Sequence, residues 1–148
     1  MTLQFLAGKA TPIYQSSADI AKLELSDKEW QQRLSTDAYQ VLRKGKTEVR
    51  TSSPLNREWR PGLYYCRGCD LELFTSQMKY ESNTGWPSFF DHIKGHLETY
   101  TDLKAVPPER GYRCARCGGH HGHLFMDGPL PTGERWCNNG VALRFVPA

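Results

Sequence analysis

Apolar positions in the first third of the chain recur at helical spacing. Ser26, followed by Glu29 three residues later, forms an S-x-x-E capping box, and Trp30 and Leu34 supply a sparse apolar stripe. A capping box satisfies backbone N–H groups that an isolated helix start leaves unpaired. The pattern therefore predicts a short helix that begins near Asp27.

A second helical segment follows in "TDAYQVLRKG", residues 36–45. Tyr39, Val41 and Leu42 provide its apolar positions, and cations occupy the last turn, where they complement the helix dipole. Gly45 suits the helix end because glycine adopts the left-handed conformation without strain. We expect a second short helix here.

From residue 52 onward the helical pattern gives way to short segments typical of strands. The segments "GLYYC", "DLELF", "GYRC", "HLF" and "VALRFV" are aromatic or β-branched and are separated by Gly, Pro and Asn. Such a pattern predicts antiparallel strands joined by tight turns. The body of the protein should be mainly β.

A length of 148 residues is in the common range for one domain with one core. We expect residues 1–20 to form an N-terminal arm and residues 21–148 a single domain. The first 20 residues have too short an apolar run for a signal peptide, and no stretch approaches the roughly 20 apolar residues of a membrane span. The sequence thus predicts a soluble, cytoplasmic protein, with a monomer as the default.

Charge gives no indication of a nucleic-acid or membrane partner. The formal net charge is only +3, from 19 basic and 16 acidic residues, and like charges do not cluster beyond the short "RKGK" of residues 43–46. In the reducing cytoplasm, cysteines spaced as C-x-x-C bind metal or perform redox chemistry more often than they form structural disulfides.

Four of the five cysteines form two such pairs. Cys66 and Cys69 lie in "CRGC", and Cys114 and Cys117 lie in "CARC". Two C-x-x-C turns can close a tetrahedral shell of four sulfurs around zinc with no open position, which is the geometry of a structural site. A redox dithiol and an iron–sulfur site are the alternatives. The sequence therefore predicts a structural Zn²⁺ that ties together two distant segments.

Cys137, in "RWCNNGVALRF", is left over. A lone cysteine in a strand is often an inert small hydrophobe. Arg135 and Asn139, however, are each two residues away and would share its face of an extended strand. A guanidinium so placed stabilises a thiolate and lowers the thiol pKa. Cys137 is thus a candidate nucleophile.

Three histidines and an aspartate follow the second cysteine pair in "GGHHGHLFMDGP". His120 and His123 are candidate proton donors, since histidine titrates near neutral pH; extra metal ligation is the alternative. Asp127 would orient one of these histidines or simply pack in the turn. His121, between the two, is expected to point elsewhere.

Residues 86–96 carry two further features. Trp86 and Phe89 flank a proline in "GWPSFF", and their rings belong either to the core or to a rigid apolar wall for a small ligand, such as a methylsulfur group. The histidines of "DHIKGH", His92 and His96, are interpreted as surface residues.

Taken together, "GWPSF", "GHLFMDGP", "RWCNNGVALRF" and the double C-x-x-C resemble methionine-R-sulfoxide reductases of the B type, from about Leu25 to Pro147. The resemblance implies reduction of the R epimer of methionine sulfoxide, in proteins and also as the free amino acid. It further implies two antiparallel sheets with short N-terminal helices, a tent-like β fold, and the structural zinc that many members carry.

The resemblance also assigns roles to individual residues. Cys137 matches the nucleophile that attacks the sulfoxide sulfur and becomes a sulfenic acid, and His120 and His123 match the histidines that help to protonate the sulfoxide oxygen. Trp86 matches the tryptophan that packs against the substrate methyl group. Supporting pocket positions are matched by Asp127, Arg135 and Asn139.

One departure concerns regeneration. Many members carry a resolving cysteine two residues before the pocket tryptophan, where this chain has Thr84. With four thiolates held by zinc, we expect an external thiol to reduce Cys137 directly. Thioredoxin is the expected donor, with glutaredoxin or a small thiol as alternatives.

Two functions from other classes stay open at this point. One is a non-catalytic zinc-ribbon module that holds a peptide or nucleic acid against Trp86, although the surroundings of the cysteine pairs lack the basic residues typical of nucleic-acid modules. The other is a hydrolase in which Cys137 is acylated and His123 acts as base.

Overall fold

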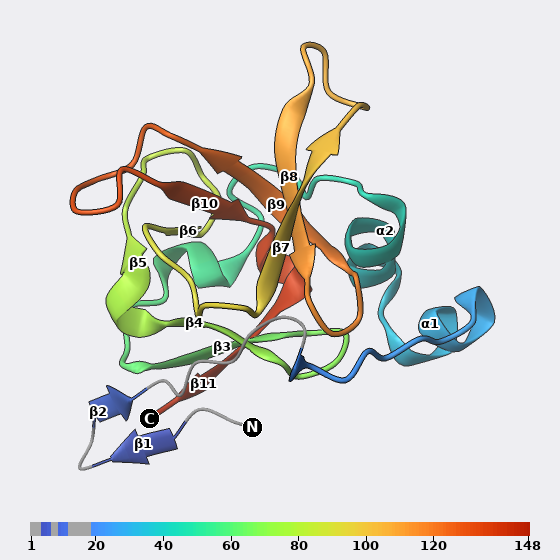
Figure 1. Cartoon of the computed structure of the whole chain (residues 1–148), viewed down its shortest axis with the longest axis horizontal. Helices are drawn as coiled ribbons and strands as arrows, with labels where there is room; N and C mark the ends of the chain where they lie inside the picture. The colour runs from blue at the N-terminus through green and yellow to red at the C-terminus, as the bar shows by residue number, and fades with distance from the viewer. Residues whose placement is uncertain (1–3, 7–8, 12–18) are drawn as a thin grey trace.

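Two antiparallel sheets form the body of the protein in a computed structural model that describes residues 4–6, 9–11 and 19–148 (Figure 1). The strands of the larger sheet are, in spatial order, β5 (Lys79–Tyr80), β6 (Ser88–Phe89), β10 (Arg135–Asn138), β9 (His120–Phe125), β8 (Glu109–Cys114) and β7 (Leu97–Asp102). Those of the smaller sheet are β11 (Leu143–Pro147), β3 (Gly62–Cys66) and β4 (Glu72–Thr75). A separate pair joins β1 (Gln4–Leu6) to β2 (Lys9–Thr11). The predicted mainly β fold is confirmed.

Both predicted helices are present and lie together at one side of the sheets, on the right in Figure 1. Helix α1 (Asp27–Arg33) has the expected capping box: Ser26 Oγ accepts from Glu29 N at 3.2 Å, and Ser26 N donates to Glu29 Oε1 at 3.0 Å. Helix α2 (Thr36–Lys44) ends at Gly45, whose φ of 70° is left-handed, as expected of a glycine cap.

The strand predictions are accurate in place and less accurate in length. Strand β3 coincides with "GLYYC", whereas "VALRFV" starts its strand late because Gly140–Ala142 forms a 3-10 turn. Two further 3-10 turns cover Pro54–Arg57 and Ser76–Met78. Strand β7, "LETYTD", was not predicted, because an edge strand rich in polar residues resembles a loop in sequence.

The core lies between the two sheets. Phe89 of β6 stacks on Phe74 of β4, with ring centroids 3.9 Å apart, and meets Tyr64 of β3 edge-on at 5.0 Å. Phe89 is 0% exposed, so its ring offers no surface to a ligand. Of the two alternatives for Phe89, the structure supports the core residue and not the wall of a binding site.

Packing into the core begins at the end of the expected arm. Ile20 is buried, and Leu23 N donates to Arg116 O at 2.9 Å, which fastens the segment to the loop after β8. The expected arm falls largely on residues 1–3, 7–8 and 12–18, which lie outside the described residues. In the part of the chain that the structure describes, no helix has the length and apolar character needed to cross a membrane.

Candidate active site and metal centre

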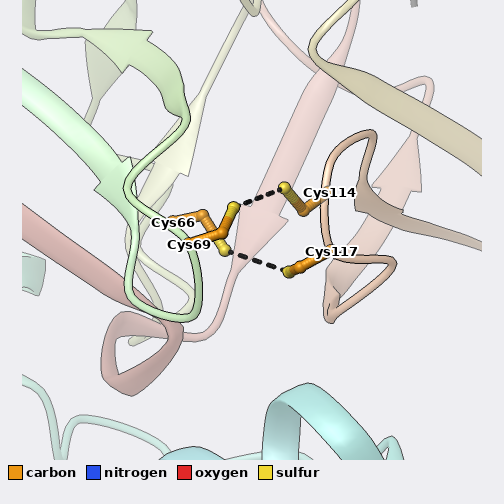
Figure 2. Close-up of side chains that lie close together, drawn as sticks. All are labelled: Cys66, Cys69, Cys114 and Cys117. Carbon is orange, nitrogen blue, oxygen red and sulfur yellow. Dashed lines mark hydrogen bonds between the residues drawn. The ribbon is translucent and has the colours of Figure 1, made fainter. Parts of the chain in front are cut away.

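The four paired cysteines converge at the junction of the two sheets (Figure 2). Cys66 closes β3 of the small sheet and Cys114 closes β8 of the large sheet, and all four sulfurs lie within 4.8 Å of one another. Sγ of Cys66 is 3.7 Å from Sγ of Cys117, and Sγ of Cys69 is 3.4 Å from Sγ of Cys114. Segments about 50 residues apart in sequence therefore contribute to one buried cluster.

This cluster fits a structural metal ion. A tetrahedral zinc with Zn–S bonds of about 2.3 Å separates its sulfurs by roughly 3.8 Å, close to the spacing seen here. Burial raises the pKa of the Cys66 thiol, so thiolate charge at this position needs a compensating cation. Backbone N–H groups of Arg116 and Gly119 point at Cys114 Sγ and Cys117 Sγ, each at 3.4 Å, as they do in metal-binding knuckles.

A row of residues across the large sheet contains the fifth cysteine. Tyr80 of β5 pairs with Ser88 of β6, Ser88 pairs with Cys137 of β10, and Cys137 pairs with His123 of β9. Residues directly opposite one another on neighbouring strands share a face of the sheet. Cys137 is half-buried on this face, which also carries His123, while its neighbour Trp136 is buried on the other face.

A bulge in β9 brings a second histidine to the same face. Arg113 of β8 pairs with His120 and Tyr112 pairs with Gly122, so His121 is an extra residue in β9. Regular alternation would place positions 120 and 123 on opposite faces, and one inserted residue restores them to the same face. The rings of the two histidines accordingly lie 5.3 Å apart, centroid to centroid.

His121 points the other way, as predicted. It is 0% exposed, and its Nε2 lies 3.2 Å from Cys66 Sγ. The side chain therefore packs beside the cysteine cluster and not beside Cys137.

Both site histidines have partners from the edge strand β7. Nε2 of His123 lies 2.8 Å from Oδ2 of Asp102, and Nδ1 of His120 lies 2.5 Å from Oη of Tyr100. The sequence-based interpretation missed both partners, although alternation along "LETYTD" puts Tyr100 and Asp102 on one face of a strand. Once that segment is recognised as a strand, its alternation predicts that Tyr100 and Asp102 face the same way.

Asp127, the residue expected to orient a histidine, has a different partner. Its Oδ1 accepts from Arg135 Nε at 2.8 Å and its Oδ2 accepts from Arg135 Nη2 at 3.1 Å, a two-pronged ion pair. The structure assigns the histidine-orienting contact to Asp102 instead. Asp127 fixes the guanidinium of Arg135.

Burial and neighbouring charge set the protonation of these groups. Burial, reinforced by the nearby His123, lowers the pKa of His120 to about 4, so its ring is neutral at neutral pH. Burial acts to raise the pKa of Asp102, but the hydrogen bond from His123 and that from Lys104 N outweigh it, and the pKa is lowered. Asp102 is therefore an anion beside His123.

The pKa of the Cys137 thiol differs from the sequence-based expectation. Arg135 acts to lower its pKa, as expected, but burial has the larger effect and the charge of Glu48 adds to it, so the pKa is raised to about 11. The ion pair with Asp127 also offsets the positive charge of Arg135. In the free protein Cys137 is a thiol at neutral pH.

Asn139 is a buried residue that directly follows β10. Strand β10 ends at Asn138, and Asn139 is 3% exposed. Its Nδ2 donates to His121 O at 2.9 Å, and its Oδ1 accepts from Glu48 N at 3.0 Å. The side chain thus joins β9 to the segment around Glu48.

Glu48 is a second residue that the sequence-based interpretation missed. Its carboxylate accepts from Gly140 N at 2.8 Å and Val141 N at 2.9 Å, and its carbonyl oxygen accepts from Trp86 Nε1 at 3.2 Å. These bonds fix Trp86 relative to the end of β10. No short motif marks Glu48, because its partners are 38 to 93 residues away.

A cleft of about 670 Å³ is present but does not contain this site. It lies between α2, the segment 46–55 and β11, and Cys137, His120 and His123 are not among its lining residues. A catalytic site for thiol chemistry needs a nucleophile and a proton donor, and Cys137 and the two histidines supply both. We therefore place the candidate site at Cys137 and not at this cleft.

The two histidines interpreted as surface residues are largely buried. His96 is 1% exposed and its Nδ1 contacts Glu72 O. His92 lies against the indole of Trp136, with ring centroids 4.4 Å apart. Their polar sequence context, "DHIKGH", concealed this packing.

Cys137 shares a sheet face with His123, which is held by a carboxylate, and the four-cysteine cluster is buried at a separate place. A free thiol beside a held histidine is typical of a thiol enzyme, and the cysteine cluster forms a separate structural centre. Comparison with known proteins identifies the family. Residues 34–147 match the SelR domain family. The chain belongs to this family of methionine-R-sulfoxide reductases of the B type.

Curated relatives are similar over most of their length. A peptide methionine sulfoxide reductase MsrB from Agrobacterium fabrum is 40% identical over 127 residues, covering 85% of this chain and 94% of that protein. An MsrB from Methanosarcina mazei is 42% identical over 126 residues, covering 84% and 90%. The mitochondrial methionine-R-sulfoxide reductase B2 of Rattus norvegicus is 40% identical over 136 residues, covering 86% and 78%.

Proposed function

We propose that this protein reduces the R epimer of methionine sulfoxide to methionine, in oxidised proteins and as the free amino acid, with Cys137 as nucleophile. One observation carries the proposal: Cys137 pairs directly with His123 across two strands, and the bulge at His121 adds His120 to the same face. A thiol and a proton donor are the two groups that the reaction requires.

In the first half-reaction the sulfur of Cys137 attacks the sulfoxide sulfur while the sulfoxide oxygen is protonated. An S–S bond forms between Cys137 and the substrate, the substrate S–O bond breaks, and the protonated oxygen leaves as water. Water then forms an S–O bond to the Cys137 sulfur and returns a proton, the S–S bond breaks, and methionine leaves with Cys137 as a sulfenic acid. The substrate sulfur is reduced by two electrons and the cysteine sulfur is oxidised by two. Because Cys137 starts as a thiol, its own proton is also available to the reaction.

His120 is suited to bind the sulfoxide oxygen as a neutral donor. The raised pKa of Tyr100 and the lowered pKa of His120 favour donation from Tyr100 Oη to His120 Nδ1. The proton of the ring then lies on Nε2, which has no protein partner among the described residues. Asp102 holds the ring of His123, the second proton donor, in place through its contact with Nε2.

The other site residues position the reacting groups. Trp86, fixed by Glu48, packs against the substrate methyl group. Arg135 counters the effect of burial on the pKa of the Cys137 thiol, and Asp127 holds the guanidinium of Arg135. Asn139 is a positioning residue that keeps the end of β10 in register with β9 through its bond to His121 O.

Regeneration requires an external thiol donor. The other four cysteines are buried together, and Thr84 bonds through its hydroxyl to Ser82 where a resolving cysteine would lie. Two thiols of the donor reduce the sulfenic acid, giving the Cys137 thiol, a donor disulfide and one water. Thioredoxin is the proposed donor, with glutaredoxin or a small thiol as alternatives.

The cofactor we propose is one structural Zn²⁺ bound by Cys66, Cys69, Cys114 and Cys117. Four buried thiolates leave no open position for chemistry, and their spacing supports zinc. We further propose that residues 21–148 act as one catalytic domain in a cytoplasmic monomer, although some relatives are named as mitochondrial or chloroplastic proteins.

Trapping the intermediate tests the proposal. One equivalent of methionine-R-sulfoxide should convert Cys137 to a species that reacts with dimedone, seen by peptide mass mapping, with no new disulfide within the chain. The S epimer serves as the matched control and should leave Cys137 unmodified. A disulfide between Cys137 and one of the cluster cysteines would refute regeneration by direct attack of an external thiol.

A further inference from the structure

A second group of side chains with potential metal-ligand atoms adjoins Trp136, whose ring lies on the face of β10 opposite to Cys137. Asp91, His92 and Glu134 each offer one ligand atom, and these atoms lie within 4.8 Å of one another. Asp91 and His92 follow β6, whereas Glu134 directly precedes β10, so two separate loops supply the ligands. None of the three belongs to the cysteine cluster or to the proposed active site.

The imidazole of His92 is the central ligand of this group. Its Nδ1 is buried and has no hydrogen-bond partner in the described part of the chain. The nearest carboxylate oxygen, Oδ1 of Asp91, is 3.9 Å from Nδ1, which is too long for a hydrogen bond. A buried polar atom without a partner is unfavourable unless a ligand completes it.

Trp136 orients two of the three ligands. Its indole ring packs against the His92 ring at 4.4 Å, and its Nε1 donates to Glu134 Oε1 at 3.1 Å. Metal ligands are typically held in this way by neighbours that fix ring and carboxylate orientation. The loops are also joined directly, because the Thr132 hydroxyl donates to Phe90 O.

We propose that Asp91, His92 and Glu134 bind a divalent first-row transition metal ion, with Zn²⁺ as the representative. One imidazole and two carboxylates form a donor set that such ions accept, and water completes the shell. Zinc with N and O bonds of about 2.0–2.2 Å brings its ligand atoms to roughly 3.4 Å from one another. The carboxylates of Asp91 and Glu134 therefore close by about an ångström through side-chain rotation.

The ion would act as a clamp between the two loops. The loop of residues 126–134 contains Asp127, and Glu134 adjoins Arg135, so the clamp fixes the loop that holds the Arg135–Asp127 ion pair. Binding of the metal ion at this site stabilises the folded state by an amount that rises with the logarithm of the metal concentration. The proposal is independent of the reaction at Cys137.

Calorimetric titration with Zn²⁺ tests the site in protein that already holds one equivalent of zinc in its cysteine cluster. The Cys137→Ser variant is the starting protein, so the fifth thiol does not bind zinc. We expect one further equivalent to bind. Asp91→Asn and Glu134→Gln should each weaken that binding at least tenfold. Both variants keep the acceptor oxygens used by His92 N and Trp136 Nε1, which preserves the fold.

Glu81→Gln, a change at an exposed carboxylate outside the cluster, is the matched control and should leave the affinity unchanged. Unfolding temperature provides the second measurement: added Zn²⁺ should raise it in the starting protein and in Glu81→Gln, but not in Glu134→Gln. Absence of a second equivalent, or equal binding in all three variants, would overturn the proposal and leave the cluster as a set of ordinary polar contacts.

Discussion

The reactivity of Cys137 is governed by the side chains within a few ångströms of its sulfur. Burial and Glu48 act to keep it a thiol, and Arg135 acts in the opposite direction. From the sequence, only the effect of Arg135 could be predicted, because i and i+2 neighbours are visible in a strand pattern. Burial and the charge of Glu48, 89 positions away in the chain, depend on the folded structure.

The pH dependence of alkylation tests this balance. Because the pKa of Cys137 is raised to about 11, thiolate is scarce at neutral pH and increases as the pH rises. The rate of iodoacetamide labelling at Cys137, followed by peptide mass mapping, should therefore rise about tenfold per pH unit between about pH 7 and 10. In denaturant the rate should level off near the ordinary thiol pKa of about 8.5. A plateau below pH 8 in the folded protein would contradict the account.

A pair of matched aspartate variants tests which carboxylate serves the histidines. Asp102→Asn removes the anion that holds His123, so we expect kcat to fall about 100-fold with KM little changed, as for loss of a positioned acid–base group. Asp127→Asn removes only the partner of Arg135 and should cost less than about tenfold. Steady-state kinetics on methionine-R-sulfoxide measures both, and the opposite ranking would favour the original interpretation of Asp127.

At the scale of elements, the site depends on irregularities of the large sheet. The helices, strand β3 and the C-x-x-C turns follow local patterns and could be predicted. The bulge at His121 could not, since it is a property of two strands in register, and β7 was missed because its polar edge sequence resembles a loop. The sequence motifs alone identified Cys137, His120 and His123 as candidates. That the three side chains share one face of the sheet follows only from the strand pairing.

Gly111 of β8 allows Tyr100 to reach across to His120. A Cβ at Gly111 would lie 2.6 Å from Cζ of the Tyr100 ring. Gly111→Ala should therefore displace the ring, lower the free energy of unfolding by about 1–3 kcal/mol and reduce turnover. Chemical denaturation measures the first effect and steady-state kinetics the second.

A double-mutant cycle isolates the cause of that loss. In a Tyr100→Ala background the ring is gone, so adding Gly111→Ala should cost clearly less stability than it does in the wild type. An equal cost in both backgrounds would show that the ring contact is not the reason for a glycine at this position.

At the scale of the whole molecule, the cysteine cluster joins the two sheets on either side of the core. Cys66 belongs to the small sheet and Cys114 to the large one. Because the four cysteines come from both sheets, a metal ion bound by them would couple its binding to folding. The two C-x-x-C spacings predicted that the four cysteines would share one cluster. The place of that cluster at the junction of the sheets could be known only from the folded structure.

Cys69→Ser should release the metal and destabilise the fold before it affects chemistry. We expect loss of bound zinc by elemental analysis and a fall of several kcal/mol in the free energy of unfolding, the scale of a structural metal site. Cys137→Ser, a change at the remaining cysteine, should retain the metal and nearly all of the stability. A metal-free Cys69→Ser protein with wild-type stability would contradict the structural role.

Turnover of the two sulfoxide epimers, measured separately with dithiothreitol as reductant, decides whether the protein is an R-specific reductase that acts through Cys137. We expect the wild type to reduce methionine-R-sulfoxide and leave the S epimer untouched, and we expect Cys137→Ser to reduce neither. Equal activity in the serine variant, or reduction of the S epimer alone, would contradict this assignment.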